Sequence, residues 1–315
     1  MTDTTGTPAS VPRGSAIDWA VFFALGTMWG SSYLFIKIGV ETITPFTLVA
    51  FRLLIGATFL VLFVGLRGLE LPRRPRMYGH LFVLSIFSVV LPFSLITWAE
   101  QSVTSSLASI LTATVPLFVI LIAPFVLRDE GITAYRVVGL LIGFAGVVIL
   151  TGGPGGGGDL LPQLALLGAA CSYAIGGVYG RRTVTGLPPA VAAVCQVSFA
   201  FVLSASLALL FERPFELEYP LRGIGALLWL GLIGTGLAYL AFFRLLKRIG
   251  ATRTSLVAYV MPAVGIALGA LVANEPVTVP MIVGTLLVIG GILLVNLHAT
   301  PAVMFRRTFR QRTAP

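Results

Sequence analysis

The sequence predicts an all-α membrane protein with ten transmembrane helices, arranged as two inverted repeats of five helices each. Two observations support this fold class. Of the 315 residues, 57% are hydrophobic and only 10% are charged, whereas about 25% of the residues of a soluble domain are charged. The chain also repeats itself once, and each copy holds five long apolar stretches.

The ten stretches are each close to the length of about 20 residues that a helix needs to cross the hydrocarbon core. In chain order, the predicted spans are Trp19–Gly39, Pro45–Leu66, Tyr78–Ala99, Val103–Leu127, Ala134–Thr151, Pro162–Tyr179, Pro189–Phe211, Gly223–Leu246, Arg253–Ala273 and Val279–Leu297.

The repeat is visible residue by residue, with an offset that stays between 144 and 146 positions. Matching pairs are Trp29 and Tyr173, Lys37 and Arg181, Pro45 and Pro189, Arg52 and Gln196, Pro116 and Pro262, and Glu130 and Glu275. Because five is an odd number of crossings, the second copy would enter the bilayer upside down relative to the first. Inverted halves of this kind are typical of secondary transporters.

The net charge of +9 is a topology signal rather than a sign of nucleic-acid binding. If the N-terminus is cytoplasmic, seventeen of the Lys and Arg residues fall on that side, three fall on the other, and Arg52 lies inside a span. Cytoplasmic loops of membrane proteins carry such an excess. The sequence therefore predicts that both termini are cytoplasmic, and it predicts no nucleic-acid partner because no basic stretch carries interleaved aromatic residues.

The predicted spans divide the chain into five segments. Residues 1–17 are small and polar, which predicts a disordered cytoplasmic N-terminus. Residues 18–151 form the first repeat, the glycine-rich residues 152–161 a flexible linker, residues 162–298 the second repeat, and residues 299–315 a basic cytoplasmic tail. The linker lacks the Gly-Lys-Ser/Thr ending of a phosphate-binding loop, so we expect no nucleotide and no other cofactor.

Two matching prolines are candidate helix kinks, because Pro116 and Pro262 lie near the middle of the fourth and ninth spans. Each proline removes one backbone hydrogen bond and leaves the carbonyl four residues earlier, at Thr112 or Ala258, without its usual donor. Paired interruptions at corresponding places indicate a transport site. A simple kink that helps the bundle to pack is the alternative.

Arg52 is the most informative single residue, because a charge near the centre of a span costs about 2.5–3.5 kcal/mol on insertion scales and should face the bundle interior. Its counterpart Gln196 is neutral. Arg52 could bind an anionic group of a substrate, or it could form a fixed ion pair. Glu100, at the end of the third span, is the candidate partner and could also titrate during transport.

Aromatic side chains with polar tips complete the candidate substrate site, which also includes Arg52, Glu100, Thr112 and Gln196. They are Trp29, Tyr33, Trp98, Tyr173, Tyr239 and Tyr259. Interfacial belts also collect Trp and Tyr, so Trp98 could be an anchor, and the central residues could equally be core packing. No pattern of catalytic or metal-ligating residues is present, because Cys171 and Cys195 lie inside spans without a CxxC or histidine companion.

Several of these residues together resemble the EamA-type members of the drug/metabolite transporter superfamily. The similar motifs are Trp29-Gly30-Ser31-Ser32, the Arg52 span, Trp98-Ala99-Glu100-Gln101, the Pro116 helix, Asp129-Glu130-Gly131-Ile132-Thr133 and Asn274-Glu275-Pro276-Val277-Thr278. The chain departs at Ser172-Tyr173, where family members often keep a tryptophan. The resemblance implies a bacterial inner-membrane protein in which helices one to four and six to nine surround a central cavity and helices five and ten pack outside.

The predicted function is therefore a secondary transporter of small organic metabolites such as amino acids or related compounds, with export as the direction that the resemblance favours. The predicted partners are a small-molecule substrate and the lipid bilayer. Glycines four residues apart, such as Gly139 and Gly143, predict close helix packing, either within one chain or in a homodimer. The alternatives are a non-transporting membrane scaffold or regulatory subunit and an intramembrane lipid-modifying enzyme; the latter would need a cluster of acids, bases or metal ligands that the spans lack.

Overall fold

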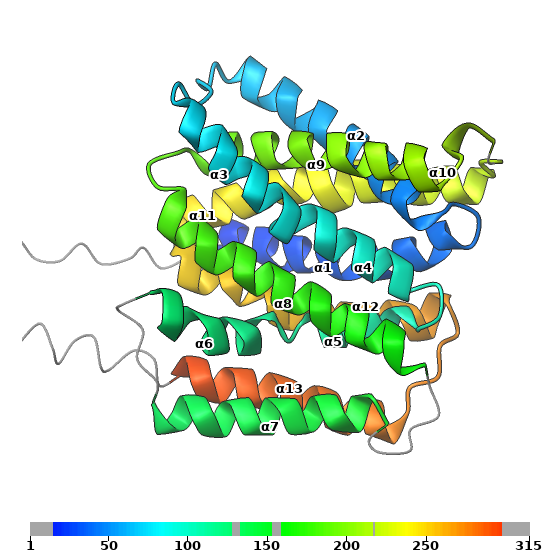
Figure 1. Ribbon diagram of the computed structural model, residues 1–315. Coiled ribbons are helices and arrows are strands. Elements are labelled where there is room, and N and C mark those ends of the chain that lie inside the picture. The colour runs from blue at the N-terminus through cyan, green and yellow to red at the C-terminus, as the bar shows by residue number, and fades with distance from the viewer. Residues whose placement is uncertain (1–14, 128–132, 153–158, 217, 298–315) are drawn as a thin grey trace, which may run out of the picture.

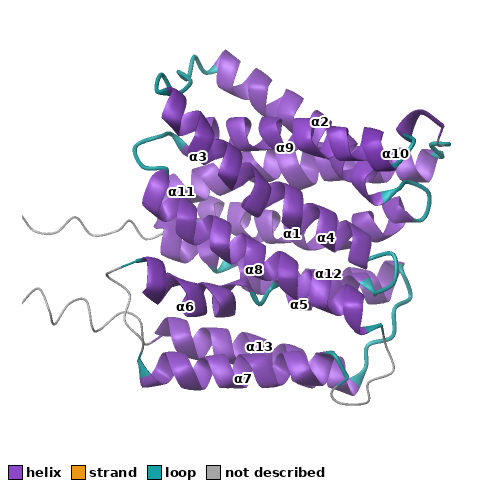
Figure 2. Ribbon diagram, in the orientation of Figure 1, coloured by secondary structure: helices purple, strands orange, loops and turns teal. Residues whose placement is uncertain are grey.

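The structure is a computed structural model that describes residues 15–127, 133–152, 159–216 and 218–297. Within these ranges every regular element is helical (Figure 2). The elements are α1 (Ala16–Val40), α2 (Pro45–Leu66), α3 (Pro75–Ser85), the π-helix η1 (Ile86–Val90), α4 (Leu91–Ala99), α5 (Ser105–Thr112), α6 (Val115–Val126), α7 (Ala134–Leu150), α8 (Leu160–Thr183), α9 (Pro189–Phe211), the short 3-10 helix η2 (Pro214–Glu216), α10 (Leu221–Leu228), the π-helix η3 (Trp229–Leu237), α11 (Ala238–Ser255), α12 (Val257–Val272) and α13 (Val279–Leu297).

The long helices run side by side between two faces of the molecule (Figure 1). We call the face where α1 begins at Ala16 the N-terminal face, and the face where α1 ends at Val40 the opposite face. Eight helical stretches are long and apolar enough to cross a membrane, and two shorter apolar helices, Ala134–Leu150 and Val279–Val295, accompany them. The prediction of an all-α membrane protein is confirmed, and these stretches correspond to the ten predicted spans.

Two helices begin inside segments for which the sequence predicts no regular structure. Helix α1 begins at Ala16, inside the segment predicted to be disordered, because Ser15 and Asp18 form a reciprocal capping box that satisfies the first backbone N–H groups. Helix α8 begins at Leu160, inside the predicted linker. The rest of the N-terminal segment, most of the linker, the C-terminal tail and the motif residues 129–132 lie outside the described residues.

The fourth span is broken where the sequence predicts it. Helix α5 ends at Thr112, residues 113–114 form a turn, and α6 begins at Val115 with Pro116 in its first turn. Pro262 differs, because it lies inside the continuous helix α12. The ninth span is irregular at Leu256, between α11 and α12. Gly250, whose φ of 81° is left-handed, lies before this span, in the connection from the eighth span, and glycine adopts that backbone at no steric cost.

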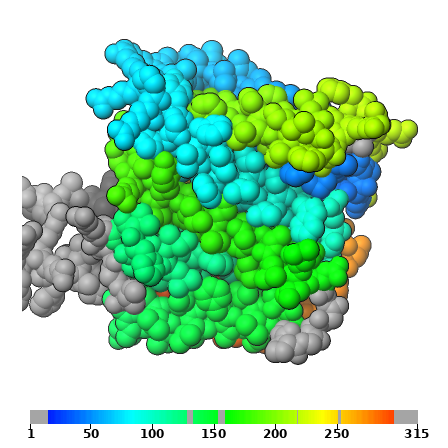
Figure 3. All heavy atoms as spheres, viewed as in Figure 1, coloured from blue at the N-terminus to red at the C-terminus, as the bar shows by residue number. Residues whose placement is uncertain are grey.

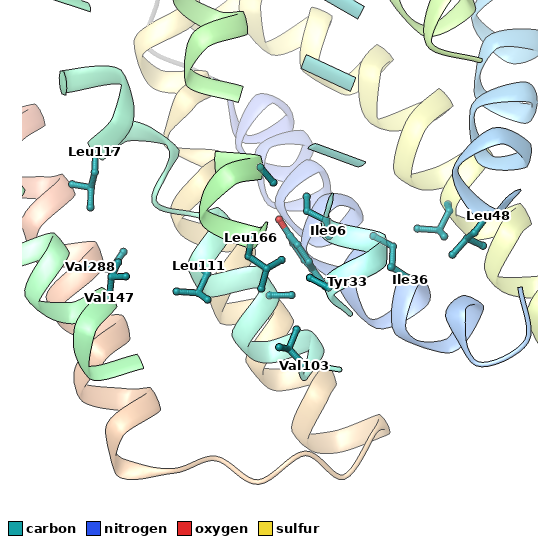
Figure 4. Packing of buried hydrophobic residues seen from close by; sticks show 14 of the residues in the cluster. Tyr33, Ile36, Leu48, Ile96, Val103, Leu111, Leu117, Val147, Leu166 and Val288 are labelled. Atoms are coloured by element: carbon teal, nitrogen blue, oxygen red, sulfur yellow. The ribbon is translucent and has the colours of Figure 1, made fainter. Parts of the chain in front are cut away.

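The helix pairing joins segments that are far apart in the sequence. Helix α2 packs on α9, α1 on α12, and α4 on α8, and Figure 3 shows the blue-to-cyan first segments beside the yellow-green region of α9 and α10. Leu111, Leu166 and Ile96 surround the ring of Tyr33 in the largest apolar cluster (Figure 4). The core is therefore built between the two halves of the chain, not within each half.

Helices α7 and α13 form a separate pair at one side of the bundle (Figure 1). Their backbones approach closely at glycines, since a Cβ atom on Gly139 or Gly146 would lie 2.6 Å from the carbonyl oxygen of Gly291 or Gly284, respectively. Small residues allow this contact where lipid supplies no hydrophobic drive. These glycine faces are used within one chain, and a homodimer through other surfaces of the two helices stays a prediction.

Two glutamates hold helix starts on the opposite face. The Glu275 carboxylate accepts hydrogen bonds from the backbone N–H and hydroxyl groups of both Ser105 and Ser106, at the start of α5. Glu212 accepts the N–H groups of Phe46 and Thr47 and the Thr47 hydroxyl, at the start of α2. Negative charge at a helix N-terminus is favourable because the orphan N–H groups point at it.

We expect Glu275→Gln to lower the stability of the protein by about 1.5–3 kcal/mol, since hydrogen bonds to a charged group contribute that much and an amide NH₂ would face N–H donors. The measurement is the melting temperature of the detergent-solubilised protein. Glu216→Gln is the matched control, because Glu216 pairs only with Arg213 at the exposed surface. Equal melting temperatures for the two variants would contradict the capping role.

Candidate functional site

A cavity of about 740 Å³ lies in the middle of the bundle. It is lined by residues of α1, α2, α3, η1, α4, α5, α6, α8, α9, η3, α11 and α12 together with the α8–α9 connection, and among the described residues none of its lining comes from α7 or α13. Its volume falls within the range of about 300–1,000 Å³ that small-molecule sites occupy. Both halves of the chain therefore contribute walls to one cavity.

The cavity extends toward the N-terminal face. Its lining there includes Arg181 at the end of α8, Leu187 between α8 and α9, and Leu246 of α11, four residues before the kink at Gly250. In the other direction its lining ends at residues such as Ile36 and Ile96, within the bundle. A ligand could therefore reach the cavity from the N-terminal face.

Side chains of both halves close the bundle between the cavity and the opposite face. The rings of Phe35 and Trp229 are stacked with centroids 4.6 Å apart, and the Trp229 indole N–H donates to the Ser31 hydroxyl at 3.0 Å. Lys37 Nζ donates to the backbone carbonyls of Glu100 and Val103 at 2.7 and 2.9 Å. These contacts join α1 to η3 and to the turn between α4 and α5.

Arg52 lies in the wall of the cavity and is only 5% exposed. Its Nε donates to the Thr235 hydroxyl at 3.2 Å, and its guanidinium carbon lies 4.1 Å from the centre of the Phe93 ring. Thr235 in turn donates to the Leu230 carbonyl at 2.9 Å, five residues earlier. The π-helix η3 thus fixes the hydroxyl that orients Arg52.

A second π-helix occupies the corresponding place in the third span. The N–H of Leu91 bonds to Ile86, five residues earlier, and Pro92 has no N–H to offer Phe87. The carbonyl of Phe87 accepts instead from the Ser172 hydroxyl of α8, at 2.7 Å. Ser172 therefore satisfies a backbone group that a membrane helix cannot leave unpaired in lipid.

Seven of the ten predicted substrate-binding residues line the cavity. They are Trp29, Tyr33, Arg52, Thr112, Tyr173, Gln196 and Tyr239. Tyr33 Oη and Thr112 Oγ1 are hydrogen-bonded at 2.6 Å, and Thr112 also donates to the Ala108 carbonyl in the last turn before the break in the fourth span.

The other three lie outside the cavity lining. Trp98 is 41% exposed at the surface, Tyr259 packs against the largest apolar cluster, and Glu100 is fully buried. The proposed ion pair between Arg52 and Glu100 is not formed, because Arg52 bonds to Thr235 and neither Glu100 carboxylate oxygen has a hydrogen-bond partner among the described residues. The pairing was predicted because both residues lie near the same end of their spans. That position does not determine which groups each side chain meets.

We expect Glu100→Met to raise the melting temperature of the solubilised protein at pH 8. A buried carboxyl group without a hydrogen bond destabilises the fold, and an apolar side chain of similar volume removes this penalty of about 1–3 kcal/mol. Gln101→Met is the control, since the neighbouring Gln101 side chain is exposed. A lower melting temperature for Glu100→Met would mean that the carboxyl group has a stabilising partner.

Sequence reasoning missed three residues that build the site. Phe93 lies against Arg52, Thr235 orients it, and Ser172 completes the backbone of η1. A signal was present for Thr235, because glycines at 231, 234 and 236 surround it within one span and so many glycines weaken an α-helix. Phe93 carried no comparable signal beyond its place next to Pro92.

No group of three or more potential metal ligands occurs within the described part of the chain. Cys171 and Cys195 are both free thiols.

The fold and the cavity define a class of protein, namely a helical membrane protein whose halves enclose a site between spans, as transporters do. The chain belongs to the EamA-like transporter family, which matches residues 18–152 and 160–297. The resemblance to EamA-type transporters is thus confirmed.

The curated relatives agree with this family. The chain is 31% identical over 261 residues to the "Uncharacterized inner membrane transporter YedA" of Escherichia coli K12, covering 82% of this chain and 83% of that protein. It is 27% identical over 275 residues to the "Uncharacterized transporter YoaV" of Bacillus subtilis 168, covering 85% and 92%. A solved structure described as "Crystal structure of protein" matches with a TM-score of 0.64 at 22% identity, covering 94% of this chain and 99% of that one, which supports the fold alone.

These relatives are named as transporters and not as enzymes. The protein is accordingly a transporter of the inner membrane that crosses the bilayer several times.

Proposed function

We propose that the protein is a secondary transporter of small organic metabolites, such as amino acids or related compounds, that works by alternating access. The observation that carries this proposal is the central cavity, which reaches the N-terminal face and ends inside the bundle before the opposite face. A transporter in one of its two end states has this shape, because the site must be open to one side and closed to the other.

The inverted relation of the two halves is part of the proposal. By the offset of the sequence repeat, Ile86–Val90 of the third span corresponds to part of Trp229–Leu237 in the eighth span. Both segments are π-helical. Such segments occur often at functional sites, and here both lie at the cavity, next to Phe93 and Arg52. When the transporter changes between its two end states, the two halves of the chain would move relative to each other about this region.

The direction follows from the charge bias of the loops. If the N-terminal face is cytoplasmic, as the seventeen-to-three excess of basic residues predicts, the cavity is loaded from the cytoplasm, and outward transport is the direction we propose. Fusing a reporter that is active on one side of the membrane to each end of the chain tests this orientation. Reporters active on different sides would exclude an even number of crossings.

Counterflow in proteoliposomes tests the transport function itself. Vesicles are loaded with one unlabelled metabolite and diluted into a trace of the labelled compound, with and without a pH gradient. A carrier gives transient, saturable accumulation. A channel or a non-transporting scaffold gives none.

The chain offers a matched pair of variants for this assay. Gly177 lines the cavity and has no atom within 4 Å of an added Cβ, and Gly290 has the same free space on the exposed side of α13. We expect Gly177→Leu to narrow the cavity and reduce counterflow, and Gly290→Leu to leave it unchanged, with both proteins folded. Equal rates for the two variants would mean that the cargo does not pass through this cavity.

A further inference from the structure

The charge of the cavity lining has one sign. Its charged residues within the described ranges are Arg52, deep in the bundle, and Arg181, near the N-terminal face, and none of the described lining residues is an aspartate or a glutamate. The other polar side chains that line it are neutral: Tyr33, Tyr173, Tyr239, Thr112, Ser32, Ser88 and Gln196, with the Trp29 indole.

No described carboxylate forms an ion pair with Arg52. The described residues offer it one hydrogen-bond acceptor, the Thr235 hydroxyl, which Nε uses, and no carboxylate lies within 4.0 Å. Phe93 covers one face of its guanidinium group. The two terminal nitrogens of the guanidinium group can therefore donate to a ligand in the cavity. Their N–H groups match the two oxygens of a carboxylate.

A buried charge without a partner is costly, so an anion in the cavity would recover a large part of that cost. A cation would instead meet an unpaired guanidinium in surroundings of low polarity. An ammonium group would find only neutral acceptors, such as the tyrosine hydroxyls and the Gln196 amide. The lining therefore discriminates by charge, and it does so in the part of the cavity furthest from the N-terminal face.

Aromatic rings line another part of the cavity. Trp29 and Phe242 have ring centroids 5.5 Å apart, Tyr239 and Phe243 have centroids 5.7 Å apart, and all four rings line the cavity. These rings lie on α1 and α11, on the side of Arg52 that leads to the N-terminal face. They offer apolar surface to the body of a molecule whose charged group has reached Arg52.

We propose that the cargo is a small organic anion, with one carboxylate bound by Arg52 and an apolar or aromatic body among the rings, and that an ammonium group weakens its binding. This inference rests on the proposed transport function and narrows its cargo: of the compounds named there, it favours acids related to amino acids over the amino acids themselves. It separates simple carboxylic acids from amino acids, which carry the same carboxylate with an added positive charge.

A series of four compounds with one phenyl body tests the charge preference: 3-phenylpropanoate, 3-phenylpropanamide, phenylalanine and 3-phenylpropylamine. Binding to purified protein in detergent is measured by calorimetry and by quenching of tryptophan fluorescence, because Trp29 lines the cavity. We expect the propanoate to bind at least tenfold more tightly than the amide and phenylalanine, and the amine to show no binding. Phenylalanine or the amine binding as tightly as the propanoate, or no binding of the propanoate, would overturn the proposal.

Variants then locate the contact. Arg52→Gln is expected to bind the propanoate and the amide equally, whereas Arg73→Gln, which alters an exposed arginine paired with Glu70, should keep the wild-type preference. Arg52→Lys retains the charge and serves if the glutamine variant does not fold; it should prefer the propanoate over the amide, but less strongly than the wild type. An unchanged preference in Arg52→Gln would remove Arg52 from the proposal.

Binding in detergent does not depend on transport, so the two proposals fail separately. Anion binding without counterflow would contradict the transport function and support the ligand class. Counterflow of cations or zwitterions, with no selective binding of the anion, would support transport and refute the ligand class.

Discussion

Replacing Arg52 by glutamine is expected to lower the initial rate of counterflow at least about tenfold, which corresponds to about 1.4 kcal/mol of lost interaction with the cargo. The physical reason is that Arg52 is the one charged residue in the deep part of the described cavity lining, and the terminal nitrogens of its guanidinium group have no acceptor from the described residues. The rate is measured in proteoliposomes with the best cargo from the screen, and the melting temperature confirms that the variant is folded.

Two further variants make this prediction specific. Arg52→Lys keeps the charge but loses the planar fork, so we expect a rate between those of the wild type and Arg52→Gln. Thr235→Val removes the hydroxyl that orients Nε, and we expect a smaller loss than in Arg52→Gln because the charge stays in the cavity. Wild-type transport by Arg52→Gln would show that the guanidinium group has only a structural role.

The second large effect is expected on stability, from Gly291→Ala in α13. A Cβ atom at this position would overlap the backbone of Gly139 and Gly143 in α7, and backbone cannot move aside as a flexible side chain can. Overpacking of a close contact costs about 1–3 kcal/mol, so the melting temperature should fall by several degrees and α7 and α13 should separate.

Gly290→Ala is the matched control, one residue away in the same helix. An added Cβ there has no atom within 4 Å, and alanine is favoured over glycine in a helix by about 1 kcal/mol. Its melting temperature should therefore equal or exceed that of the wild type. A fall of equal size in both variants would mean that glycine is needed for helix flexibility and not for the contact between α7 and α13.

The deep part of the site was predictable to the extent that it depends on local chemistry. An arginine inside an apolar span must face the interior, so Arg52 could be assigned to the cavity from the sequence. Pro116 also signalled the end of α5, because a proline inside a helix removes one backbone hydrogen bond. Pro262, by contrast, lies inside the continuous helix α12.

The partners of these residues could not be predicted in the same way. Glu100 looked like the counter-charge of Arg52, yet Thr235, 183 positions away in the chain, accepts the bond. That hydroxyl reaches Arg52 because η3 widens the helix and carries glycines that allow α2 to approach; a Cβ on Gly231 would lie 2.5 Å from the Ile55 side chain. The π-helical hydrogen bonds follow from packing between distant helices.

The sequence by itself determined the class of this protein, because apolar spans, their number and the charges between them depend only on local composition and on the cost of placing polar groups in lipid. Tertiary structure alone decided which side chains meet in the cavity, which face it reaches, and that Arg52 has no acidic partner among the described residues. Those properties depend on how helices from the two halves are rotated against each other, and that rotation is set by close packing at glycines and by hydrogen bonds between residues more than 80 positions apart.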